Sequence, residues 1–238
     1  MASREVERIL QSALLTLALA VLLLFGSARA QQTVFNVPSG DVLDKGKTYG
    51  ELDFAYRNSD GAASFTPRVV VGIGGRVEVG LNLSGFNVPA DVQTTLSPAI
   101  KWKAYDGGSN GWACLLGDDL FVPVQNKTYN AGNYFYAEVT KMWSTKTRAT
   151  VGAFHFTRDV VASGKRAGGQ FAIEQPIGPR VTMAADWYTG NQSLGFVTPG
   201  IVVKLTPKLT WYGSCQIGNR DASSGNHQFL TEFGWSFN

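Results

Sequence analysis

The chain has 238 residues, a formal net charge of +3, 44% hydrophobic residues and 16% charged residues. So balanced a charge argues against nucleic acid as a partner, because nucleic-acid binding requires clustered positive charge. The two cysteines and two histidines have no metal-ligand spacing, so the sequence predicts neither a metal site nor another cofactor.

Residues 1–30 have the features of a secretory signal peptide. An uncharged stretch rich in Leu and Ala runs from Ala13 to Phe25, with Arg4 and Arg8 before it and the small-residue site Ala28-Arg29-Ala30 after it. The 13-residue stretch is shorter than the ~20 residues that span a bilayer, which favours cleavage before Gln31 over an uncleaved helical anchor. The sequence therefore predicts an exported protein that begins at residue 31.

Residues 31–46 carry turn signals at Pro38-Ser39-Gly40 and at Asp44-Lys45-Gly46, without a regular period. We expect an extended N-terminal periplasmic segment here, which either stays in the periplasm or tucks into the mouth of the domain that follows. That domain spans residues 47–238.

The rest of the chain repeats segments in which apolar and polar residues alternate. In Arg76 to Ser84, for example, Val77, Val79, Leu81 and Leu83 share one face. A strand has a side-chain period of two, so this alternation predicts strands with one apolar and one polar face. Twelve such segments are expected: 48–56, 65–73, 76–84, 95–105, 112–122, 133–143, 147–156, 167–175, 180–188, 197–205, 209–217 and 227–237.

The connections between these segments alternate between short turns and longer loops rich in Gly, Asn, Asp and Ser. Short turns at one end and long loops at the other are typical of outer-membrane barrels whose termini are both periplasmic. Twelve strands also enclose a space too wide for side chains to fill, since about eight strands already leave just enough room. We therefore predict an all-β fold: a closed antiparallel transmembrane β-barrel of about 12 strands, with its apolar face toward lipid.

At this point the chain resembles bacterial outer-membrane β-barrel proteins, most specifically in Phe229 to Phe237, where aromatic residues alternate. The resemblance implies a location in the bacterial outer membrane and recognition of this strand by the barrel-assembly machinery. The chain departs from the pattern by ending in Asn238 rather than an aromatic residue. The stretch Val34-Phe35-Asn36-Val37-Pro38-Ser39 with Gly46 is also similar to the start of uncharacterised barrels and outer-membrane transporters.

Charged residues on the polar face are the candidate functional residues. Charge rings at a constriction select solutes by sign, whereas a salt-bridged network would only fill a narrow lumen, and the sequence leaves both interpretations open. Tyr134, Tyr136, Tyr188 and Tyr212 share this face. Aromatic side chains beside polar groups suit sugars or other flat solutes, but we expect these tyrosines simply to fill the interior. The predicted pore-lining residues are Glu51, Asp53, Arg68, Glu78, Lys101, Glu138, Arg180, Asp186 and Glu232.

Four tryptophans, Trp102, Trp143, Trp211 and Trp235, lie near expected short turns or the C-terminus. Indole rings prefer the headgroup level, so these residues predict a membrane-interface girdle. Cys114 and Cys215 fall on separate expected strands, which predicts two unpaired thiols rather than a disulfide.

The sequence predicts an outer-membrane channel for passive diffusion of small polar solutes, with the lipid bilayer as its surroundings and no enzymatic activity. One alternative is a structural or adhesive surface barrel without a pore. Another is a lipid hydrolase of the Ser/His/Asn type, for which His155 and His227 are the available histidines, although no G-x-S-x-G motif is present.

Overall fold

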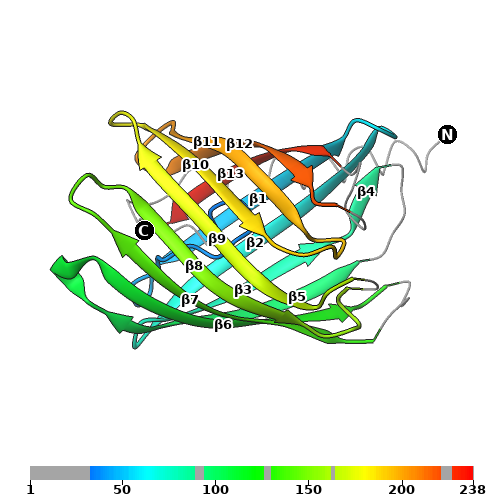
Figure 1. The fold of residues 1–238 in the computed structure, drawn as a ribbon, viewed down its shortest axis with the longest axis horizontal. Helices are drawn as coiled ribbons and strands as arrows, with labels where there is room; N and C mark the ends of the chain where they lie inside the picture. Colours follow the sequence, from blue (N-terminus) through cyan, green and yellow to red (C-terminus); the bar gives the residue numbers. More distant parts are fainter. Residues whose placement is uncertain (1–32, 89–93, 126–129, 162–163, 221–226, 238) are drawn as a thin grey trace, which may run out of the picture.

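A computed structural model describes residues 33–88, 94–125, 130–161, 164–220 and 227–237, and these form a closed antiparallel β-barrel (Figure 1). Apart from the short β4, which pairs with β2, the strands pair with their neighbours in chain order, and β1 pairs with both β2 and β13, which closes the sheet. No helix in the described residues is long and apolar enough to span a membrane. The strands are β1 (Thr48–Arg57), β2 (Ala62–Gly74), β3 (Val77–Ser84), β4 (Phe86–Val88), β5 (Thr95–Asp106), β6 (Trp112–Pro123), β7 (Gly132–Met142), β8 (Arg148–Phe156), β9 (Ala167–Pro176), β10 (Val181–Tyr188), β11 (Phe196–Lys204), β12 (Leu209–Gly218) and β13 (Gln228–Phe237).

The thirteen strands occupy twelve strand positions around the barrel, because β3 and β4 are successive parts of one interrupted strand. Both pair with β2, and they are separated only by Gly85, whose φ of 96° breaks the strand. The predicted twelve-strand barrel is thus confirmed, and its strand boundaries differ from the expected ones by only a few residues. A short 3-10 helix, η1 (Gly108–Asn110), lies in the turn between β5 and β6.

Apolar side chains of the alternating rows lie on the outside of the barrel. On β3 and β5, Val79, Leu81 and Ile100 are 37% to 47% exposed, while Glu78 and Lys101 beside them are buried. The pairing of β6 with β7 runs without a shift through Asp118 and Asp119, and the pairing of β5 with β6 has an irregularity between Lys103 and Tyr105. The apolar-out, polar-in arrangement follows directly from the period of two.

Both cysteines are free, as predicted. Cys114 lies on β6 and Cys215 on β12, and five strands separate β6 from β12 in the order of the sheet.

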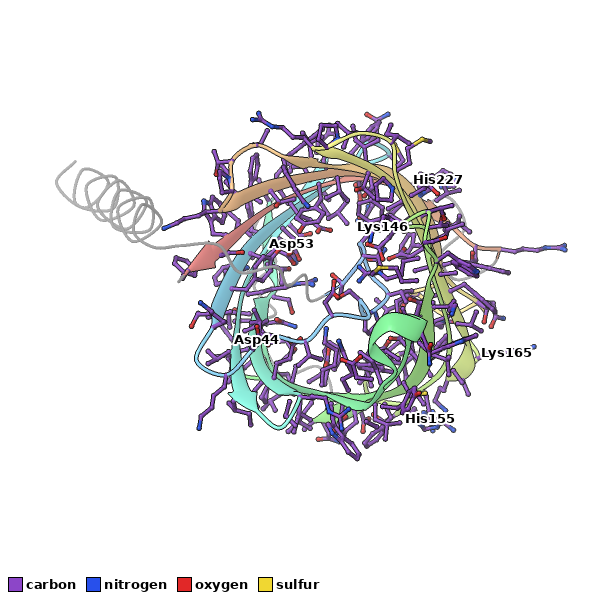
Figure 2. All side chains as sticks on the ribbon, turned by 90° about the vertical axis from the view of Figure 1, so that its left-hand side faces the viewer. Asp44, Asp53, Lys146, His155, Lys165 and His227 are labelled. Atoms are coloured by element: carbon purple, nitrogen blue, oxygen red, sulfur yellow. The ribbon has the colours of Figure 1, made fainter. Side chains whose placement is uncertain are left out.

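Residues 33–47, which we call the lumen segment, lie inside the ring of strands. Figure 2 shows this segment as the blue chain within the barrel, ahead of β1. Val34, Phe35 and Val37 are at most 1% exposed and belong to one hydrophobic cluster with side chains of the inner wall. The described part of the N-terminal region therefore occupies the lumen.

Candidate functional site in the barrel interior

The predicted pore-lining residues lie mainly on the inner wall. Seven of them are between 1% and 5% exposed: Glu51, Asp53, Glu78, Lys101, Glu138, Asp186 and Glu232. The Arg68 side chain is 19% exposed and lies among the same group. Arg180 is elsewhere, because β10 begins at Val181 and leaves Arg180 in the exposed turn before it.

Ion pairs connect many of these interior charges. Lys101 Nζ lies 2.9 Å from Glu78 Oε1, and Arg68 Nη2 lies 2.7 Å from Asp53 Oδ2. Arg148 at the start of β8 binds both oxygens of Glu174 at 2.5 and 2.7 Å. Buried charges are costly without such partners, so this pairing lowers the cost of a charged interior.

The first anchor of the lumen segment is the Asp186 carboxylate on β10. The backbone amides of Phe35, Asn36 and Val37 all donate to Asp186 Oδ2, at 3.0, 2.5 and 2.8 Å. A tight turn, closed by the Val34 amide donating to the Val37 carbonyl at 2.7 Å, holds the three amides in this direction. Converging backbone amides form a natural anion site, and hydrogen bonds to a charged acceptor are the strong ones.

Asn36 extends this anchor to the neighbouring strands. Its Nδ2 donates to Thr198 Oγ1 on β11 at 2.8 Å, and its Oδ1 accepts from Gln216 Nε2 on β12 at 2.6 Å. The Tyr188 hydroxyl on β10 donates to the Asn36 carbonyl at 3.1 Å. Asn36 of the lumen segment thus binds three consecutive strands, β10, β11 and β12.

The rest of the lumen segment is held by residues of β8, β3 and β2. Asp41 Oδ2 lies 2.6 Å from Arg148 Nη1, and the Leu43 amide donates to Glu78 Oε2 at 2.8 Å. At Gly72 on β2, a Cβ would lie 2.1 Å from the Asp44 carbonyl oxygen, so only glycine permits this close approach. The segment is therefore fixed at both ends before the chain enters β1.

An aromatic cluster fills the space around Phe35. Tyr134, Phe154, Phe156 and Tyr188 pack together, with ring centroids 4.9 Å apart for Tyr134 and Phe156 and 5.2 Å apart for Phe154 and Tyr188. Burying each large apolar side chain of the segment contributes roughly 1.5–3 kcal/mol. The expectation that the tyrosines fill the interior holds, and the lumen segment supplies the apolar partner that they pack against.

Acid should weaken the ion pair between Asp41 of the lumen segment and Arg148 on β8. Burial acts to raise the pKa of the Asp41 carboxyl, but the Arg148 guanidinium more than offsets this effect and holds the pKa below its ordinary value. A carboxyl whose pKa is lowered on docking stabilises the docked segment above its ordinary pKa of about 3.9, and this stabilisation is lost as the pH falls through the lowered value. We expect the current through single barrels to increase as the pH falls below about 4, and Asp41→Asn to remove this step. If the current depended on pH in the same way in the wild type and in Asp41→Asn, the assignment of this step to the Asp41 carboxyl would be contradicted.

The predicted girdle tryptophans lie on outward positions near the short turns. Trp102 on β5 and Trp143 after β7 are 44% and 46% exposed, and Trp211 and Trp235 are half-buried on β12 and β13. Trp211 Nε1 donates to Thr231 Oγ1 at 2.7 Å. Their place at one end of the barrel fits the predicted interface, and their role there stays a prediction.

The two histidines lie away from the interior cluster. His155 is exposed on β8 at the outer perimeter of the ring in Figure 2, and in the described part of the chain it makes no hydrogen bond to a hydroxyl. His227 Nδ1 accepts a hydrogen bond from the Gly218 amide at 3.2 Å.

No protein-family model matches the chain, and no curated protein matches it. Among solved structures, it is similar to the KdgM porin in complex with disordered oligogalacturonate, with a TM-score of 0.58 and 9% identity over 80% of this chain and 99% of that one. It is also similar to the NanC porin, with a TM-score of 0.60 and 10% identity over 79% and 99% of the two chains. The outer membrane phospholipase A from Escherichia coli aligns with a lower TM-score of 0.47, at 11% identity over 83% and 94%.

These similarities define the class of the fold. The chain has the fold of the outer-membrane β-barrel porins.

Proposed function

We propose that the protein is an outer-membrane channel for the passive diffusion of small hydrophilic solutes. The observation that carries this proposal is the charged inner wall of a barrel whose outer wall is apolar. A wall of this kind suits a water-filled path, because it presents polar groups to solutes and apolar groups to lipid. No cofactor or energy source is required, since solutes follow their gradient.

The sign of the interior charge indicates the preferred solutes. The buried charged residues of the inner wall are seven carboxylates and two basic residues, and half-buried Arg68 adds a third base. Carboxylate-rich constrictions favour cations over anions. One structural neighbour is a porin in complex with oligogalacturonate, an acidic carbohydrate, which supports a hydrophilic solute and does not bear on the charge of the solute of this chain. For this chain we propose neutral and cationic solutes.

The lumen segment is the constriction of the proposed channel. It is joined covalently to the barrel only through β1, and polar contacts to Asp186, Arg148 and Glu78 hold it against the wall. Because these contacts are separate hydrogen bonds and ion pairs rather than part of the sheet, the segment can leave the wall without disrupting the barrel.

Charge selectivity in planar bilayers tests the proposal. The mature chain, residues 31–238, is inserted into a bilayer that separates two KCl concentrations. We expect a zero-current potential of the sign that a cation-selective pore gives. Glu138→Gln should reduce this potential, because Glu138 is a buried carboxylate of the inner wall. Asp118→Asn is the matched control, since Asp118 faces outward and binds Asn133 Nδ2 at 3.0 Å. Selectivity for anions would contradict the proposed solute class.

A structural barrel without a pore is the second candidate. It is favoured by the low solvent exposure of the interior charges, several of which are at most 2% exposed. Planar bilayers that stay sealed, both with the mature chain and after removal of the lumen segment, would support this candidate over the channel. For either candidate we propose insertion through the barrel-assembly machinery, with Phe229 and Phe237 on the outward row of β13 as part of its signal.

A further inference from the structure

Three carboxylates converge on the inner wall where the first and last strands meet. Asp53 on β1 and Glu232 on β13 are directly opposite each other in the strand register, and Glu51 lies two residues before Asp53 on the same face. One oxygen from each carboxylate lies within 4.8 Å of the other two. All three residues are at most 5% exposed. Figure 2 shows Asp53 on the inner side of the ring.

Glu232 is the residue that requires an explanation. It is 1% exposed, and neither of its carboxylate oxygens has a hydrogen-bond partner among the described residues. Glu51 Oε1 and Asp53 Oδ1 also lack hydrogen bonds there. A buried carboxylate without a partner is strongly unfavourable, so such a group in a native structure indicates a bound ion, water or proton.

The local charge points to an ion with two positive charges. Arg68 lies 2.7 Å from Asp53 Oδ2 and 3.5 Å from Glu51 Oε1, so one cation faces three carboxylates. Two negative charges are left without compensation inside the wall. A divalent cation would neutralise both and supply the missing partner of Glu232.

We propose that Glu51, Asp53 and Glu232 bind a divalent cation of the size of calcium. Ca²⁺ takes carboxylate oxygens at 2.3–2.6 Å, so a central ion can reach oxygens separated by up to about 4.8 Å, whereas Mg²⁺ requires about 2.0–2.1 Å. Such an ion would join β1 to β13, the pairing that closes the barrel. The site belongs to the wall and stands independently of the proposed channel activity.

Terbium luminescence can test this site in the folded, detergent-solubilised mature chain. Tyr49 donates to Glu51 Oε2 at 2.6 Å and lies 3.2 Å from the Tyr212 hydroxyl, which places aromatic sensitisers beside a bound Tb³⁺ ion. We expect saturable luminescence from one ion per chain, displaced by CaCl₂. Glu232→Gln should lower the affinity at least about tenfold, because it removes one of the charged ligands.

Glu138→Gln is the matched control, since it makes the same change at another buried carboxylate, on β7. It should leave the Tb³⁺ affinity unchanged. A second measurement is the midpoint of thermal unfolding, which CaCl₂ should raise in the wild-type protein and not in Glu232→Gln. If Glu232→Gln does not fold, Glu51→Gln takes its place.

The proposal is overturned if the wild-type barrel gives no saturable luminescence, or if Glu232→Gln binds Tb³⁺ as well as the wild type does. Stabilisation by acid without any response to CaCl₂ would also overturn it, because protons would then balance the charge.

Discussion

Removing residues 31–43 from the mature chain should increase its single-channel conductance several-fold. Val34, Phe35 and Val37 fill the interior in contact with the aromatic wall, Asp41 binds Arg148 on β8, and Leu43 binds Glu78 on β3. Without them, the cross-section available to water and ions widens, and conductance rises with that cross-section. Conductance of single barrels in planar bilayers is the measurement.

Removal of residues 31–32 alone is the control for this truncation, because it shortens the chain while leaving the lumen segment complete. Folding of each protein is checked by its resistance to unfolding in detergent before the recordings. If the longer truncation folds and conducts no more than the control, then the lumen segment is not the constriction of the proposed channel.

Asp186→Asn should release residues 35–37 of the lumen segment from the wall. A single carboxylate oxygen accepts the amides of Phe35, Asn36 and Val37, and hydrogen bonds to a charged group contribute about 1.5–3 kcal/mol each. The neutral amide of asparagine keeps the shape and loses the charge, so we expect a loss of about 2 kcal/mol in docking. That loss corresponds to about a 30-fold increase in the ratio of undocked to docked segments, which should appear as more frequent openings in bilayer recordings.

Glu138→Gln distinguishes docking from a general effect of interior charge. It also neutralises a buried carboxylate, but Glu138 accepts its hydrogen bond from Gln170 of the wall rather than from the lumen segment. Equal opening frequencies for Asp186→Asn and Glu138→Gln would contradict the role of Asp186 as an anchor.

The barrel could be predicted from the sequence because its main signal is local. The alternation in Val77 to Ser84 assigns each side chain to a face, and the same period assigns Glu51, Asp53 and Glu232 to the interior. The one predicted pore residue outside the group, Arg180, lies at a strand end, where the period no longer determines the direction of a side chain.

The arrangement inside the barrel could not be predicted in the same way. Asn36 finds its partners on β10, β11 and β12, about 150 to 180 residues further along the chain, and nothing in its local sequence marks them. Asp186 was assigned to the interior, but its partners are backbone amides, which any residue carries. The convergence of Asp53 and Glu232 depends on the register in which β13 meets β1, and alternation alone does not fix that register.

Hydrogen exchange at the amides of Phe35, Asn36 and Val37 tests the central claim most directly, because it reports whether the lumen segment is docked on Asp186 in the folded protein. In the mature chain, folded in detergent, these amides should exchange far more slowly than those of an unstructured peptide, and Asp186→Asn should accelerate them. Exchange at the rate of a free peptide in the folded wild-type barrel would contradict it.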